Sequence, residues 1–135
     1  MGNKTTWVAI VDDEESIRRA LLRLFRSVGL EAQAFRSGQG FLSSLQHTMP
    51  SCVVMDLHMP EMSGFAVLEE LKTYAPDLPV VIMTAHQINI GQLESSLSTA
   101  IAVLQKPVND DVLLDAITKA TKPPELVAAE NVKEN

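Results

Sequence analysis

The chain has 135 residues, of which 46% are hydrophobic and 21% are charged, which is enough for one globular domain with a core of ordinary size. Its net charge of −6 argues against direct binding of nucleic acid or of an anionic membrane surface, because both need a basic patch. No apolar run reaches the length of a membrane span and the first residues lack the pattern of a signal peptide, so we expect a cytoplasmic protein.

Five short apolar runs, mostly rich in β-branched residues, alternate with segments of helical spacing. The runs are Trp7–Val11, Glu31–Phe35, Cys52–Met55, Val80–Met83 and Ala102–Leu104. Apolar stripes at helical spacing occupy residues 17–28, 41–45, 65–72 and 112–117, and a poorly encoded helix is expected over 88–98, which contains a glycine and three serines. This alternation predicts an α/β fold with a parallel sheet between two layers of helices.

Punctuating residues fix the expected ends of these elements. Gly29 is a natural stop for the first helix, the third should start after Gly64 and end before Pro76, and Asn109 or Asp110 is suited to cap the last. Residues 1–5 are expected to be a disordered N-terminus and 6–121 the domain. Residues 122–135 read as a linker or tail, because they hold two prolines, mixed charge and few apolar side chains.

Chemically active side chains follow four of the predicted strands. Asp12 and Asp13 follow the first run, Asp56 the third, Thr84 the fourth, and Lys106 comes shortly after the fifth. Ligands of open parallel sheets bind beyond the carboxyl ends of the strands, so we expect these groups to converge in one crevice. Three neighbouring carboxylates repel one another and attract a hard cation such as Mg²⁺. With an ammonium and a hydroxyl beside them, such groups suit the transfer of a phosphoryl group to a carboxylate.

Four stretches resemble the motifs of two-component response-regulator receiver domains, the CheY-like family. They are IVDDEES at Ile10–Ser16, VVMDLHMPEMSG at Val53–Gly64, VVIMTA at Val80–Ala85 and LQKPV at Leu104–Val108. All four stand in the order of the family, and the likeness extends from about Thr6 to Thr121. The resemblance implies a flavodoxin-like (βα)5 doubly wound sheet of strand order 2-1-3-4-5, in a three-layer α/β/α arrangement.

The same resemblance implies a role for each residue of the pocket. Asp56 would accept a phosphoryl group from a sensor histidine kinase or a phosphotransfer protein. Lys106, before a cis bond to Pro107, would contact that group, and Thr84 would move toward it. The Mg²⁺ ligands would be Asp12, Asp13, Asp56 and the backbone carbonyl of His58. A receiver of this kind is a signalling switch and not an enzyme, since it catalyses only its own phosphorylation and dephosphorylation.

The resemblance also suggests partners outside this chain. The overall pattern is similar to receivers that precede a helix-turn-helix DNA-binding domain in LuxR- or FixJ-type transcriptional regulators. Phosphorylation would then change the conformation of an output face that a C-terminal domain or another protein reads, and it could promote a homodimer. A stand-alone phosphorelay shuttle stays open as well.

Several positions depart from the family pattern. Val103 stands three residues before the lysine, where an aromatic ring usually follows the threonine, and a valine has no ring to swing. Thr99 replaces a common glycine and Val108 a frequent phenylalanine. We therefore expect phosphorylation to be retained but its signal to be propagated differently.

Three side chains are expected to border the phosphoryl group. His58 lies two residues after Asp56, and Ala85 and His86 follow Thr84. Imidazole titrates near neutrality, so the two histidines predict a phosphoryl lifetime that depends on pH between about 6 and 8. Two exposed histidines without a role remain the alternative.

Three other functions fit parts of the sequence. A phosphatase with an aspartyl-phosphate intermediate would need a second carboxylate two residues after Asp56, where His58 stands. A flavin-binding module would need a phosphate-binding loop after the first strand, where this chain has acid. A phosphorylation-independent interaction domain would not need the set of strand-end groups.

Overall fold

A computed structural model describes residues 6–85 and 100–121. Five strands form one sheet in which all neighbours run parallel, in the order β2-β1-β3-β4-β5. The strands are β1 (Trp7–Val11), β2 (Glu31–Phe35), β3 (Cys52–Asp56), β4 (Val80–Thr84) and β5 (Ala100–Gln105). The described helices are α1 (Glu15–Ser27), α2 (Gly38–Ser44), α3 (Gly64–Tyr74) and α5 (Asp110–Thr121). The predicted fold class and strand order are confirmed.

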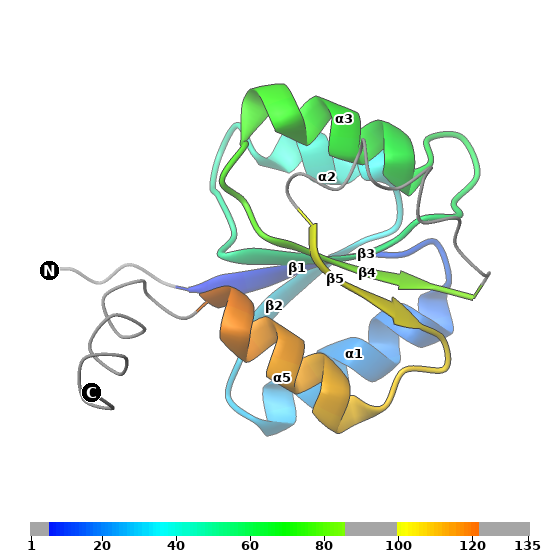
Figure 1. Cartoon of the computed structure of the whole chain (residues 1–135), viewed down its shortest axis with the longest axis vertical. Helices are drawn as coiled ribbons and strands as arrows, with labels where there is room; N and C mark the ends of the chain where they lie inside the picture. The colour runs from blue at the N-terminus through cyan, green and yellow to red at the C-terminus, as the bar shows by residue number, and fades with distance from the viewer. Residues whose placement is uncertain (1–5, 86–99, 122–135) are drawn as a thin grey trace, which may run out of the picture.

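The helices cover both faces of the sheet, as Figure 1 shows. Helices α2 and α3 lie on one face, and α1 and α5 lie on the other. The helix predicted over 88–98 and the substitution at Thr99 lie outside the described residues. None of the described helices is long and apolar enough to cross a membrane.

Each face of the sheet has its own hydrophobic core. Alternate residues of β3 point to opposite faces, so Val53 and Met55 pack under α2 and α3, whereas Cys52 and Val54 pack against α1 and α5. Strands β1, β3 and β4 are buried along their whole length, as their unbroken apolar runs predict. Burial raises the pKa of the Cys52 thiol to about 12, so this cysteine is a core residue.

Capping side chains set the helix starts. The Ser63 hydroxyl accepts a hydrogen bond from the Ala66 N–H at 3.2 Å, so α3 begins at Gly64 itself, one residue earlier than predicted. The Asn109 carboxamide oxygen accepts from the N–H groups of Asp111 and Val112 at 2.8 and 3.3 Å. Of the two caps proposed for α5, Asn109 therefore fills the role.

Glycines act at two places. Gly29 ends α1 as predicted, with a φ of +81° that side chains other than hydrogen rarely tolerate. Gly64 packs directly on the end of β3. A Cβ atom there would lie 2.6 Å from the carbonyl oxygen of Asp56 and 2.7 Å from the Cα of Leu57. The glycine in the motif thus permits α3 to start against the strand that ends in Asp56.

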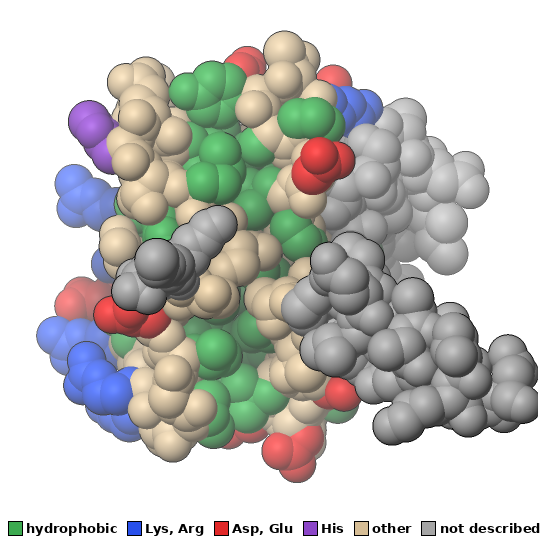
Figure 2. All heavy atoms as spheres, turned by 90° about the vertical axis from the view of Figure 1, so that its left-hand side faces the viewer, with side chains coloured by type: hydrophobic (Ala, Val, Ile, Leu, Met, Phe, Trp, Pro, Cys, Tyr) green, Lys and Arg blue, Asp and Glu red, His purple; other side chains and the backbone are tan. Residues whose placement is uncertain are grey.

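The edge at which the strands begin is mainly apolar in its centre. Figure 2 views this edge and shows hydrophobic side chains between polar and charged ones. A shallow cavity of about 350 Å³ opens there, between the turns before β3 and β4. Its apolar lining comes from Met49, Pro50, Ala75, Pro76, Leu78 and Pro79.

Candidate functional site

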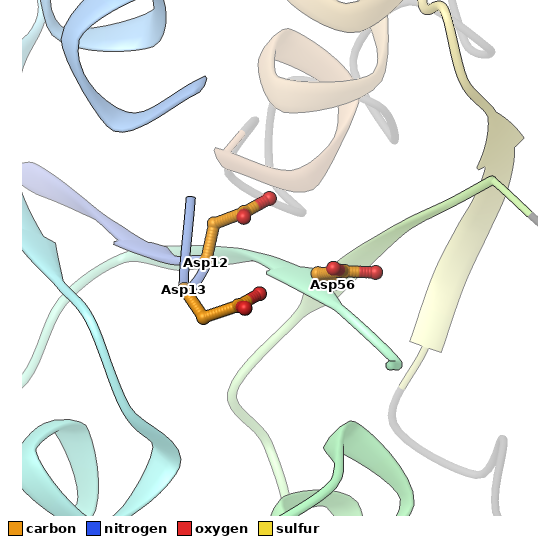
Figure 3. A group of neighbouring side chains, drawn as sticks. All are labelled: Asp12, Asp13 and Asp56. Atoms are coloured by element: carbon orange, nitrogen blue, oxygen red, sulfur yellow. The ribbon is translucent and has the colours of Figure 1, made fainter. Parts of the chain in front are cut away.

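Three carboxylates converge at the opposite edge, where the strands end. One ligand oxygen from each of Asp12, Asp13 and Asp56 lies within 4.8 Å of the others (Figure 3). Asp12 is fully buried and Asp56 is 6% exposed, whereas Asp13 is exposed to solvent. The predicted convergence of these three carboxylates at the strand ends is therefore present.

Short-range backbone contacts orient two of these carboxylates. The Glu14 N–H donates to Asp12 Oδ1 at 2.9 Å, and the His58 N–H donates to Asp56 Oδ1 at 3.2 Å. In both cases an aspartate side chain accepts from the backbone two residues on, which is the usual Asx-turn geometry. Each strand end thus turns away from the sheet around its own carboxylate.

Lys106 lies between the carboxylates as their cation. Its Nζ is 3.1 Å from Asp12 Oδ2, 3.5 Å from Asp56 Oδ2 and 3.9 Å from Glu14 Oε1. The backbone N–H of Lys106 donates to the carbonyl of Thr84 at 2.7 Å, which ties the residue to the end of β4. The bond from Lys106 to Pro107 is cis, as the resemblance implied.

The pocket holds more negative than positive charge. Burial raises the pKa of the Asp12 carboxyl, although the Glu14 N–H and the Lys106 ammonium oppose that shift. Burial alone would lower the pKa of Lys106, but Asp12 and Asp56 outweigh it, and the pKa is raised. The amine therefore stays protonated, and the site favours additional positive charge.

Comparison with known proteins identifies this arrangement. The model of the response regulator receiver domain family matches residues 8–118. The chain belongs to this family.

Two curated relatives are similar to this chain in sequence, at comparable levels of identity. Nodulation protein W of Bradyrhizobium diazoefficiens is 37% identical over 115 residues, which cover 85% of this chain and 51% of that protein. The transcriptional regulatory protein FixJ of Rhizobium meliloti is 32% identical over 123 residues, which cover 91% of this chain and 59% of FixJ. The receiver domain thus spans little more than half the length of either relative.

Solved structures agree with the fold. A receiver domain protein from Clostridium thermocellum superposes with a TM-score of 0.79 at 27% identity, and the match covers 90% of this chain and 98% of that one. Receiver domains of this family are signalling phosphoacceptors, which agrees with the expectation that this chain is a switch.

Thr84 is the fifth predicted residue of the site that Asp12, Asp13, Asp56 and Lys106 form, which we call the receiver pocket. It ends β4, is 1% exposed, and follows Met83, which pairs with Asp56 in the sheet. Its Oγ1 lies 3.3 Å from Nδ1 of His58, within hydrogen-bond distance. The His58 ring, on the loop after β3, thus reaches the hydroxyl at the end of β4.

The remaining predicted positions lie around this pocket. Ala85 is exposed beside Thr84, and Val103 on β5 is 39% exposed. His86 lies outside the described residues. An apolar cavity of about 450 Å³ opens next to Lys106, between α1 and α5. Its lining includes Ile17, Leu21, Met83, Ala85, Val108 and Leu113.

Two residues of the receiver pocket were missed at the level of sequence. Glu14 approaches Lys106, and Arg18 donates from Nη1 to the backbone carbonyl of Asp12 at 3.0 Å. Arg18 lies in α1, one helical turn after the N-cap residue Glu14, so both side chains extend toward the same rim. That spacing after the paired aspartates was the available signal.

Proposed function

We propose that this receiver domain accepts a phosphoryl group on Asp56 in a reaction that needs Mg²⁺. The main support is the single pocket in which carboxylate oxygens of Asp12, Asp13 and Asp56 lie within 4.8 Å of one another beside the Lys106 ammonium. The donor would be a phosphohistidine of a sensor kinase or of a phosphotransfer protein, as in the family.

The donor atoms of the pocket suit Mg²⁺. Carboxylate oxygens are the hard ligands that this cation prefers, and it keeps several waters, so a partial protein shell is enough. Asp12, Asp13 and Asp56 would hold it with the backbone carbonyl of His58. The raised pKa of Asp12 supports this assignment, because a buried carboxyl that resists ionisation gains from a nearby cation. When bound, the metal would neutralise oxygens of the incoming phosphoryl group.

The chain's own side chains would perform the remaining steps. A carboxylate oxygen of Asp56 attacks phosphorus, an O–P bond forms, and the N–P bond to the donor imidazole breaks, leaving the electron pair on that nitrogen. Lys106, held 3.5 Å from Asp56 Oδ2, donates to a phosphoryl oxygen. Thr84 donates from its hydroxyl. Hydrolysis of the acyl phosphate by water later returns the free carboxylate.

The whole protein would act in the cytoplasm through an output domain. Because FixJ is a transcriptional regulatory protein of which the matched part covers 59%, we assign this domain to the input part of a similar regulator. A helix-turn-helix DNA-binding domain after residue 135 and a phosphorylation-dependent homodimer belong to this proposal. Val103 leaves the output face without a switching ring, so we expect the signal to pass through the backbone after Thr84.

Acetyl phosphate with Mg²⁺ tests the proposal without a kinase. Intact-mass measurement should show the addition of one phosphoryl group to the 135-residue chain, and Asp56→Asn should abolish it. Asp77→Asn, an exposed aspartate on the turn before β4, is the matched control and should be phosphorylated like the wild type. Rapid release of phosphate over many turnovers would instead indicate a phosphatase, and no mass gain at all would contradict the proposed function.

A further inference from the structure

The contact between His58 and Thr84 couples two loops that the proposed function uses separately. The Thr84 side chain is buried, and its Oγ1 meets Nδ1 of His58 at 3.3 Å. His58 lies two residues after Asp56, which ends β3, and its backbone N–H donates a hydrogen bond to Asp56 Oδ1. The ring is therefore attached to the phosphoacceptor strand and engages the hydroxyl of the neighbouring strand.

A threonine hydroxyl has one proton to donate. We assign Nδ1 of His58 as the acceptor in this contact, because donor and acceptor roles depend on the ring tautomer. The hydroxyl can then give its proton to the ring or to a phosphoryl oxygen, but not fully to both. Its χ1 angle occupies staggered wells, so leaving one partner for another is a discrete step. The donation expected from Thr84 to a phosphoryl oxygen belongs to the phosphorylated domain, so we assign the competing contact with His58 to the unphosphorylated domain.

We propose that His58 is a positioning residue that holds Thr84 in the arrangement of the unphosphorylated domain. This inference rests on the proposed function of Asp56 and concerns the regulation of that site. Phosphorylation has to draw the Thr84 hydroxyl away from the ring, so the contact lowers the affinity of the pocket for a phosphoryl group. A contact made in only one of two states shifts the equilibrium toward that state by its own free energy.

The expected effect is modest and measurable. A neutral hydrogen bond of this kind corresponds to about a two- to tenfold change in an equilibrium constant. Truncating His58 should leave the fold unaffected, because the residue is exposed and its side chain fills no part of the core. His58→Ala also retains the backbone N–H that contacts Asp56 and the backbone carbonyl proposed for the metal.

Beryllofluoride, a noncovalent analogue of the phosphoryl group, provides the measurement. Its dissociation constant is determined at saturating Mg²⁺ for the wild type, His58→Ala, Thr84→Val and the double variant. We expect His58→Ala to bind about two- to tenfold more tightly than the wild type. In the Thr84→Val background the same substitution should have no effect, because the hydroxyl on which the ring acts is gone.

Two further variants separate positioning from packing. Asparagine places an amide atom close to the position of Nδ1, so His58→Asn should restore the wild-type affinity. His47→Ala removes another exposed histidine, in the turn after α2, and should change nothing. Without ligand, His58→Ala should also shift the methyl resonance of Thr84, and the other threonines should keep their positions.

Three results would overturn the inference. They are equal affinities of the wild type and His58→Ala, weaker binding by His58→Ala, and the same change in both Thr84 backgrounds. If the wild type bound no beryllofluoride at all with Mg²⁺ present, the proposed function of Asp56 would fail instead. The two failures are therefore distinguishable.

Discussion

The two edges of the sheet bury opposite kinds of side chain. Among the residues that the structure describes, the buried polar or charged ones are Asp12, Asp56 and Thr84, and all three lie where strands end. The same three strands begin with Trp7, Cys52 and Val80, which are buried and mainly apolar. Within residues 6–85 and 100–121, hydrophobic side chains are buried at both edges, and carboxylates are buried only at the edge where strands end.

This difference separates stability from function. Burying a carboxylate costs free energy unless it is paired, and Lys106 pairs only part of the acid at the carboxyl edge. The apolar edge has no such cost, because its side chains gain from leaving water. Substitutions at the apolar edge should therefore lower stability and leave Mg²⁺ binding unchanged. Substitutions of the buried carboxylates should instead raise the stability of the metal-free protein and weaken Mg²⁺ binding.

The largest loss of stability is expected at Gly64, where the packing of α3 and the position of Asp56 depend on the same residue. A Cβ atom there would collide with the backbone of Asp56 and Leu57, so the end of β3 would have to shift and displace the Asp56 carboxylate. Gly64→Ala should lower the free energy of unfolding by about 3 kcal/mol and also weaken Mg²⁺ binding. Chemical denaturation and metal titration measure the two effects.

Gly40→Ala in α2 is the matched control for this prediction. The added Cβ atom would meet only the Ser37 hydroxyl, at 3.2 Å, so little should change. Equal stabilities of Gly64→Ala and Gly40→Ala would show that the close approach of α3 to β3 is unimportant.

Val80→Ala tests the apolar edge alone. Val80 is fully buried at the start of β4, and losing two methyl groups there should lower the free energy of unfolding by about 2 kcal/mol. The Mg²⁺ affinity of the folded protein should stay at the wild-type value. A fall in affinity as large as that of Gly64→Ala would mean that the two edges are not independent.

Asp12→Asn should have the smallest effect on stability, with the opposite sign. Removing one buried charge leaves Lys106 paired with Asp56, so the metal-free protein should become more stable near neutral pH, by about 1 kcal/mol as is common when a buried charge is replaced by a neutral group. Because the folded-state pKa of Asp12 is raised, the wild type loses stability as pH rises from the unfolded pKa of about 4 through the folded one. The gain of the variant should therefore vanish in acid.

Metal binding should change in the other direction. Asp12→Asn removes one of the proposed anionic ligands, so we expect the Mg²⁺ affinity to fall by about tenfold or more. Denaturation curves at several pH values, each with and without Mg²⁺, measure both effects. A variant that is less stable without metal at neutral pH would show that Asp12 serves the fold and not the cation.

The fold and the acidic cluster follow from the sequence because both depend on local patterns. Alternating strand and helix periods imply a parallel sheet, and the carboxyl ends of parallel strands share an edge. Asp12, Asp56 and Thr84 come directly at those ends, so their convergence needed no knowledge of rotamers. The start of α3 was predicted one residue too late, because Ser63 caps the helix and the position of a cap depends on the local turn as well as on residue type.

Contacts between side chains of separate elements could not be predicted from the sequence. The meeting of His58 with Thr84 depends on the rotamers of both residues and on the exact loop after β3. The same holds for Arg18, whose long side chain could have pointed to solvent but donates to the Asp12 carbonyl. Residue spacing along the chain restricts such contacts without selecting one.

Chemical trapping of the acyl phosphate tests the central claim most directly. The chain is incubated with acetyl phosphate and Mg²⁺, reduced with borohydride, and digested for peptide mass mapping. Reduction converts a phosphorylated aspartate to homoserine, and we predict this change at position 56 alone, with none after chelation of the metal. Homoserine at another aspartate, or trapping that persists without Mg²⁺, would contradict a metal-assisted phosphoacceptor at Asp56.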